Sequence, residues 1–260
     1  MKLSHISEQE LKAYESDLRK FFEACSYSLK DECILIYINK LKELYKPKTL
    51  RNKLIRIRKF LKFINHPIAG SISIPRVPKR LKKVIKIADV RKLLEEINSK
   101  IKDEEIKQML NSAILITATS GLRAEELYKL EIEDIDIENR TIFLKAEKTK
   151  DYEDRIAFFS EEAKQALMHY LNSNPDPERP FRKKSIYHHF KKIDSDLRLK
   201  HMRKFFSQQS DRLGMPTTIK KLLMGHSPRG DVDLNHYDFQ DEEELRKIYD
   251  KYWRDFRILS

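Results

Sequence analysis

Glycine is scarce in this chain of 260 residues, which holds only five glycines and two cysteines. Few glycines, together with a pervasive 3.6-residue spacing of apolar side chains, predict a mostly helical protein. The two cysteines, Cys25 and Cys33, both lie in apolar helical patterns. We expect buried, reduced thiols there, because one pair supports neither a disulfide framework nor a metal framework.

Long apolar runs are also missing. The longest, around residues 113–116, is far too short to span a bilayer. The first residues, Met1–Glu8, carry charge where a signal peptide needs an apolar stretch. We therefore expect a soluble protein of the cytoplasm that has no membrane partner.

Acidic residues are absent between Leu44 and Ala88, although this segment holds fourteen lysines and arginines. The whole chain has a net charge of +12 and a pI near 9.4, so an acidic polymer is its natural partner. An ordinary solvated surface mixes charges of both signs. The one-sided charge of this segment therefore favours contact with a phosphate backbone.

A helix capped by Thr49 is predicted inside this segment. Its apolar residues recur every three or four positions and form one packing stripe, which consists of Leu50, Leu54, Ile57, Leu61 and Ile64. The rest of its surface is basic. The residues that we expect to bind DNA come from this helix and from the segment after it: Arg51, Lys53, Arg58, Lys62, Lys79, Arg80, Lys82 and Lys83.

Two domains are expected. Residues 67–86 contain prolines, serines and a basic exit, which is typical of a linker. A helical domain over residues 1–66 precedes the linker, and a larger domain over residues 87–260 follows it. Such a pair suits a clamp that closes around a duplex, with the linker along its phosphates.

The fold class that the periodicity predicts is mainly α with a small antiparallel β-sheet. Two strands, 141–145 and 155–159, flank a charged turn. The other expected helices are 7–25, 30–45, 103–120 ended by Gly121, 124–130, a helix from 161, 183–194, 199–213, 218–224 ended by Gly225, and 242–256. The last one either packs on its own domain or docks on a neighbouring protomer.

Several cations in the larger domain could converge on a phosphate. Arg123 follows Gly121 at a helix start, where backbone N–H groups favour an anion, although a surface pair with Glu125 or Glu126 would also explain it. Lys200 and Arg203 leave the same face of one helix, because they are three residues apart. Two adjacent cations repel each other unless an anion lies between them.

His226 follows Gly225 at a helix end, where it could donate a hydrogen bond or move a proton near neutral pH. A zinc site made by His201, His226 and His236 lacks cysteine and a recognisable ligand spacing. In the charged turn, Lys148 or alternatively Lys150 could deliver a proton to a leaving oxygen. Tyr237 has a phenol that could attack phosphorus if cations stabilise its oxyanion.

These segments resemble the conserved boxes of the tyrosine recombinase, or phage integrase, family. The match is carried by Thr119-Ser-Gly-Leu-Arg-Ala-Glu-Glu-Leu127 and by the stretch from Arg203-Lys-Phe-Phe to Leu223-Met-Gly-His-Ser. It covers the chain from about Ile87 to its end. The usual His-x-x-Arg is Lys200-x-x-Arg203 here, a variant similar to integrases of archaeal viruses and plasmids.

The resemblance implies a helical core-binding domain followed by a tyrosine-recombinase catalytic domain. It also implies six catalytic residues: Arg123 and Arg203 as ligands of the non-bridging oxygens, Lys148 as general acid, Lys200 and His226 in support, and Tyr237 as nucleophile. The identity of the general base stays open, because Lys200 replaces the usual histidine. Cleavage within or between protomers also stays open, because His226 and Tyr237 are eleven positions apart, about two more than usual.

The implied reaction is site-specific recombination through a 3′-phosphotyrosine, without a metal or nucleotide cofactor. The expected partners are a double-stranded attachment site and a tetramer of this chain on two duplexes, close to the nucleoid. Two alternatives remain: a DNA-binding relative without activity, and a nicking enzyme similar to type IB topoisomerases.

Overall fold

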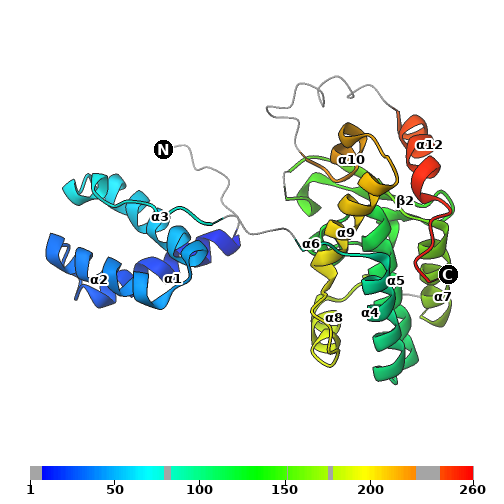
Figure 1. The fold of residues 1–260 in the computed structure, drawn as a ribbon, viewed down its shortest axis with the longest axis horizontal. Coiled ribbons are helices and arrows are strands. Elements are labelled where there is room, and N and C mark those ends of the chain that lie inside the picture. Colours follow the sequence, from blue (N-terminus) through cyan, green and yellow to red (C-terminus); the bar gives the residue numbers. More distant parts are fainter. Residues whose placement is uncertain (1–7, 79–82, 151, 175–177, 227–240, 260) are drawn as a thin grey trace. The chain divides into compact units, whose positions relative to one another are not determined.

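The chain folds into two compact units, Met1–Lys82 and Lys83–Ser260, each with a hydrophobic core of its own (Figure 1). The computed structural model describes residues 8–78, 83–150, 152–174, 178–226 and 241–259. Within these ranges the chain is mostly helical with one three-stranded antiparallel sheet, so the predicted fold class is confirmed. None of the described helices is both long and apolar enough to cross a membrane.

The first unit consists of α1 (Glu8–Ala24), α2 (Asp31–Leu44), α3 (Pro47–Phe63) and the short 3₁₀ helix η1 (Pro67–Gly70). The packing stripe of α3 is buried from Leu50 to Leu61, as predicted. Ile64 instead lies just beyond the helix and is half-exposed. The predicted cap at Thr49 is wrong, because α3 begins at Pro47, whose fixed φ suits the first helical position.

The start of the predicted linker belongs to the core of the first unit. Ile68, Ala69 and Ile72 are buried there. Two arginines of α3 hold this returning segment: Arg58 donates to the carbonyl of Ala69 (3.2 Å) and Arg51 to the carbonyl of Pro75 (3.1 Å). The boundary between the two units, Lys82 to Lys83, falls inside the predicted linker range of 67–86.

The second unit holds the other helices and the sheet. Its helices are α4 (Ile87–Lys100), α5 (Glu104–Ser120), α6 (Ala124–Leu127), α7 (Glu161–Ser173), α8 (Lys183–Phe190), α9 (Leu199–Arg212), α10 (Thr217–Leu223) and α12 (Glu242–Trp253), with 3₁₀ turns η2 (Ile132–Asp134) and η3 (Ala146–Lys148). Sequence periodicity did not single out α4. It also extended α6 and α8 by several residues beyond their ends.

The sheet has the order β1 (Ile135–Asp136), β2 (Thr141–Leu144), β3 (Arg155–Phe158), and both pairings are antiparallel. The strands predicted on either side of the charged turn are confirmed as β2 and β3. Ile142 pairs with Ala157, and both are fully buried. Arg155 therefore enters β3 at a fixed register, directly opposite Leu144.

Helix α5 forms the centre of the second unit, with α7 and α9 packed against it (Figure 1). Its residues are buried continuously from Ser112 to Ser120, as expected of a helix that is apolar all round. The helix ends at Gly121, which has a left-handed φ of 70°. The end of the most buried helix thus fixes the position of the next residues, which lead to Arg123.

Helix α12 packs on its own unit, so the first of the two predicted alternatives is confirmed. The buried hydroxyl of Tyr249 donates to the carbonyl of Thr119 (2.9 Å), and the indole nitrogen of Trp253 donates to the hydroxyl of Ser210 (3.1 Å). The Trp253 ring stacks on Phe206 with centroids 4.9 Å apart. Helix α12 therefore supports both α5 and α9.

Candidate active site

The C-terminal end of α10 is the centre of the candidate site. Gly225 has a left-handed φ of 60°, and its N–H donates to the carbonyl of Leu222 (2.8 Å), while the N–H of His226 donates to that of Lys221 (3.0 Å). These two bonds form a Schellman motif. The prediction that Gly225 ends this helix is confirmed, and His226 follows the turn directly.

Three arginines bind this helix end. Its last three carbonyls each accept a hydrogen bond from a different guanidinium: Leu223 from Arg155 (2.9 Å), Met224 from Arg203 (2.6 Å) and Gly225 from Arg123 (3.3 Å). Carbonyls at a helix C-terminus carry partial negative charge, which favours cations there. Residues from β3, from α9 and from the start of α6 are thereby brought together.

A buried carboxylate lies between two of these arginines. Glu126 is 2% exposed. It accepts hydrogen bonds from the backbone N–H of Arg123 (2.8 Å), from Nη1 of Arg123 (2.7 Å) and from Nη2 of Arg155 (2.5 Å). The predicted pairing of Arg123 with a nearby glutamate is therefore present. It is a buried contact, however, and it does not exclude the convergence of Arg123 with the other cations.

Arg203 joins the two glycine turns of the site. Besides its bond to Met224, it donates Nη1 to the carbonyl of Gly121 (2.7 Å). Gly121 is also needed for space, because a Cβ there would lie 2.5 Å from the ring of Phe206. The end of α5 and the end of α10 are thus held at a fixed separation by one side chain.

His226 lies among these cations, and its pKa is lowered. Partial burial of the ring is the main cause, followed by the positive charges of Arg203 and Arg123 and then of Lys221 and Arg155. The imidazole is therefore neutral at pH 7 and can accept a proton. Among the described residues, three guanidiniums and one carboxylate, Glu126, meet at this helix end. Guanidiniums bind anions such as phosphate well, so an anion is favoured beside this histidine.

Lys148 is bound to carboxylates. Its ammonium lies 2.7 Å from Glu131 and 2.5 Å from Asp134, and its side chain is only 12% exposed. Burial lowers its pKa, but the hydrogen bonds and charges of the two carboxylates outweigh this effect, so that the pKa of Lys148 is raised. Lys150 is exposed and forms no ion pair or hydrogen bond within the described ranges.

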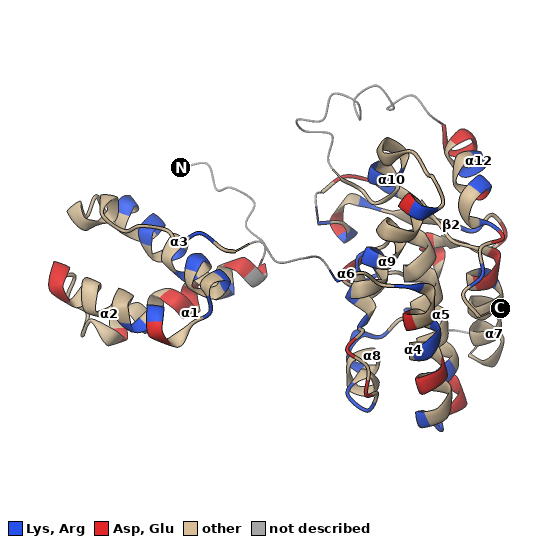
Figure 2. Ribbon diagram, viewed as in Figure 1, with Lys and Arg blue, Asp and Glu red and all other residues tan. Residues whose placement is uncertain are grey.

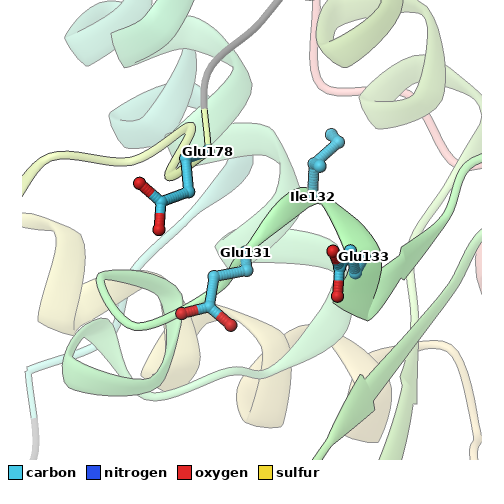
Figure 3. Close-up of a pocket in the computed structure, with 4 residues that line it drawn as sticks. All are labelled: Glu131, Ile132, Glu133 and Glu178. Carbon is cyan, nitrogen blue, oxygen red and sulfur yellow. The ribbon is translucent and has the colours of Figure 1, made fainter.

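An acidic hollow of about 320 Å³ lies beside Lys148. Its lining consists of Glu131, Ile132, Glu133 and Glu178 (Figure 3). Carboxylates repel phosphate, so this hollow is unsuited to a DNA phosphate. The only lysine that reaches one of its carboxylates from the hairpin turn is Lys148, as far as the described residues extend.

Contacts among the described residues do not bring two other predicted catalytic residues, Lys200 and Tyr237, into the site. Lys200 is exposed on α9, one turn before Arg203, and forms no ion pair in the described part of the chain. Tyr237 lies outside the described residues. The zinc hypothesis gains no support: Nδ1 of His201 accepts the backbone N–H of Arg198 (3.0 Å), His236 is not described, and the described residues contain no group suited to a metal ion.

The basic face of α3 is partly neutralised, which corrects the expectation of unrelieved positive charge (Figure 2). Asp17 of α1 is buried and forms ion pairs with Lys53 and with Arg56 (2.7 Å for the latter). Lys62 and Lys83 are exposed, whereas Arg51 and Arg58 hold the returning segment. Lys79, Arg80 and Lys82 lie outside the described residues.

A second basic surface, which the sequence expectations did not include, lies on and just after α8. No acidic residue occurs between Arg179 and Lys192, and α8 is coloured blue and tan, without red, in Figure 2. Exposed Tyr187 lies beneath Lys191, whose ammonium is 5.2 Å from the ring centroid. The signal for this surface was the same local absence of acid that pointed to α3. We name it the α8 surface: Lys183, Lys184, Tyr187 and His188 of the helix, with Lys191 and Lys192 just after it. Lys183 is partly neutralised, because it pairs with Glu125 (2.8 Å).

Residues 83–238 match the phage integrase family, which is more than half of the chain. The tyrosine recombinase XerA of Saccharolobus solfataricus is 31% identical over 186 residues, covering 68% of this chain and 59% of the relative. Tyrosine recombinase XerC of Thermodesulfovibrio yellowstonii is 29% identical over 186 residues, covering 65% and 60%. The chain thus spans about three fifths of the length of these curated relatives.

Solved structures share the fold at low sequence identity. The Tn1549 transposon integrase in complex with transposon right end DNA has a TM-score of 0.65 at 18% identity and covers 94% of both chains. The XerH recombinase bound to difH substrate has a TM-score of 0.64 at 15% identity, covering 93% of this chain and 79% of that one. The family match agrees with the site, in which arginines bind the turns at Gly121 and Gly225. This chain belongs to the phage integrase family of tyrosine recombinases.

Proposed function

We propose that this chain is a site-specific recombinase that cleaves and rejoins DNA through a 3′-phosphotyrosine intermediate. The observation that carries the proposal is the end of α10, where three guanidiniums and His226 gather. A phosphodiester under attack gains negative charge on its non-bridging oxygens, and fixed guanidiniums stabilise that charge. Membership of the phage integrase family supports the same reaction.

In the proposed reaction, the phenolic oxygen of Tyr237 attacks phosphorus while Arg123 and Arg203 bind the non-bridging oxygens. The bond from phosphorus to O5′ breaks, which gives a 3′-phosphotyrosine and a free 5′-hydroxyl. His226, neutral because its pKa is lowered, accepts the tyrosine proton, and Lys200 adds positive charge beside the phosphate. A 5′-hydroxyl from another strand reverses the step and exchanges the strands.

The leaving O5′ takes its proton from the hairpin turn, from Lys148 or Lys150. Lys148 would first have to leave Glu131 and Asp134, the two carboxylates that raise its pKa. This favours Lys150 as the general acid, with Lys148 as the anchor of the turn. A substrate with sulfur in place of O5′ separates the two roles, because a thiolate leaves without a proton. We expect it to restore cleavage by Lys150→Ala but not by Lys148→Ala.

We also propose that the first unit is a core-binding domain. Its exposed cations, such as Lys62, and the α8 surface would contact the phosphate backbone. Such contacts release counterions, so each one adds about 0.9 to the slope of log affinity against log salt concentration. Lys191→Gln should therefore reduce the slope by about one unit. Lys12→Gln is the control, because Lys12 is paired with Glu8 on α1. Equal slopes in the two variants would move the DNA surface elsewhere.

Recombination further requires two duplexes in one complex, and we propose a tetramer of this chain on them. Light scattering after size-exclusion chromatography gives the mass of the complex with attachment-site DNA. We expect four protomers with two duplexes. A single protomer on one duplex that still cleaves would instead support a nicking enzyme similar to type IB topoisomerases.

The main test is a covalent-trapping assay with nicked duplexes from the host element's attachment region. We expect a slowly migrating protein–DNA adduct with the wild type and none with Tyr237→Phe. An adduct that persists in the variant would assign the nucleophile to another tyrosine. Tight binding to a verified site without any adduct would support a DNA-binding relative that has no activity.

A further inference from the structure

Arg155 contacts the candidate site from strand β3. It begins β3, and its side chain is only 7% exposed. Its guanidinium spans two elements: Nη1 donates to the carbonyl of Leu223 (2.9 Å) and Nη2 to Oε2 of Glu126 (2.5 Å). Leu223 ends α10, which His226 follows closely, and Glu126 lies on α6, which begins directly after Arg123.

We propose that Arg155 is a positioning residue, which fixes Arg123 and His226 relative to each other and thereby sets the geometry of phosphate binding. This inference rests on the proposed function for the roles of Arg123 and His226. The contacts of Arg155 that support it are those with Leu223 and Glu126.

The contacts form a closed ring. Arg155 binds Leu223 and Glu126, Glu126 binds Arg123, and Arg123 binds the carbonyl of Gly225, only two residues after Leu223. Opening the ring at any point leaves the end of α10 joined to the start of α6 by fewer bonds. A misplacement of a catalytic group by about 1 Å can reduce a reaction rate about 100-fold. Such a ring therefore matters for catalysis even though Arg155 itself does not touch the phosphate.

The backbone of the turn also rests on the stem of Arg155. A Cβ built on Gly225 would overlap Cδ of Arg155 and would lie 2.9 Å from its Nε. The turn before His226 therefore has no room to move toward β3 while the arginine is in place. Lysine would keep the positive charge, but a single ammonium cannot reproduce a planar fork that reaches two acceptors.

Arg140 is a matched control for a merely structural arginine. It is also buried and also binds one carbonyl, that of Phe159 (3.2 Å). It pairs with the carboxylates of Asp250 (2.7 Å) and Glu161 (3.7 Å). These partners belong to the end of the sheet, to α12 and to α7. Arg140→Lys should therefore affect folding as Arg155→Lys does, but it leaves the ring intact.

The first test compares single-turnover cleavage of nicked duplex by Arg155→Lys and Arg140→Lys, at saturating protein and well below the unfolding temperature. We expect Arg155→Lys to lower the cleavage rate about 100-fold and to change the DNA affinity by less than about threefold. Arg140→Lys should keep both values within about threefold of wild type. A wild-type cleavage rate for Arg155→Lys overturns the proposal.

A second variant opens the ring without changing Arg155. Glu126→Asp shortens the side chain by one methylene group. Glu125→Asp, at the exposed neighbouring residue, is the control. Within one ring the effects are not additive, so Glu126→Asp with Arg155→Lys should cleave no more slowly than the slower single variant. Fully additive losses would contradict the ring.

The last test needs no DNA. The imidazole resonances of His226, assigned with His226→Gln, should shift in Arg155→Lys and stay in place in Arg140→Lys. Unchanged resonances in Arg155→Lys would overturn the positioning role. This measurement still decides the matter if the wild type forms no covalent adduct, a result that would contradict the proposed function alone.

Discussion

Glu126→Gln keeps the shape of the side chain and removes its charge. The carboxylate is 2% exposed and pairs with Arg155, whose side chain is 7% exposed, and with Arg123, whose side chain is 24% exposed. Removal of one partner from a buried ion pair costs about 3–5 kcal/mol, because the other charge stays buried. Water can reach Arg123, so we expect the lower end, about 3 kcal/mol. For a unit of this size that corresponds to a fall in Tm of about 6–12 °C.

The assay uses the single tryptophan of the chain. Trp253 is fully buried in the core of the second unit, so its fluorescence in urea reports the free energy of unfolding of that unit. Glu125→Gln is the control, because Glu125 pairs with Lys183 on the surface. An exposed pair contributes at most about 1 kcal/mol.

The difference between Glu126→Gln and Glu125→Gln in urea unfolding tests the ring of contacts. If both glutamine variants lose the same small free energy of unfolding, the buried carboxylate contributes no more than a surface charge, and the argument for a closed ring of contacts fails. A loss near 3 kcal/mol for Glu126→Gln alone would support the ring and give its energetic scale.

Three further predictions concern the turn, the first unit and pH. Gly225→Ala should lower the free energy of unfolding by more than Gly214→Ala. Both glycines have positive φ, but of the two only residue 214 has open space for a Cβ. Equal losses in urea unfolding would contradict the overlap with Arg155. Asp17→Asn should destabilise the first unit by about 3 kcal/mol in thermal unfolding followed by circular dichroism. It should also steepen the salt dependence of DNA binding, because it releases two cations of α3; an unchanged slope would refute this. Because the folded pKa of His226 lies below its usual 6.5, the unfolded chain binds more protons as the pH falls below 6.5, and stability declines there. His226→Gln should remove part of that decline, and an identical pH dependence of urea unfolding in both proteins would argue against it.

Local signals in the sequence were sufficient for the centre of the site. A glycine ends each of the two helices beside it. His226 follows Gly225 directly and Arg123 lies two residues after Gly121, so their places could be inferred from helix periodicity and left-handed caps. Arg203 lies one turn after Lys200 on a strongly periodic helix. These inferences needed only neighbours along the chain.

Contacts between distant residues could not be inferred in the same way. Arg155 binds a carbonyl 68 residues away, and nothing in a short strand distinguishes such an arginine from an exposed one. Lys53 lies in a segment without acid, and its partner Asp17 is 36 residues earlier. From the local sequence alone, Lys53 is therefore expected to be available to DNA.

The contact between Gly121 and Phe206 restricts the order in which this site can change. Phe206 is held by the stacked ring of Trp253, so it has little freedom to turn away from residue 121. Any side chain at residue 121 would meet that ring and would also adopt an unfavourable left-handed backbone. Substitution at residue 121 is therefore accessible only after Phe206 has become smaller, and a smaller residue at 206 first leaves a cavity beside Trp253. Each single step lowers the free energy of unfolding, so we expect descendants of this sequence to retain the two residues as a pair.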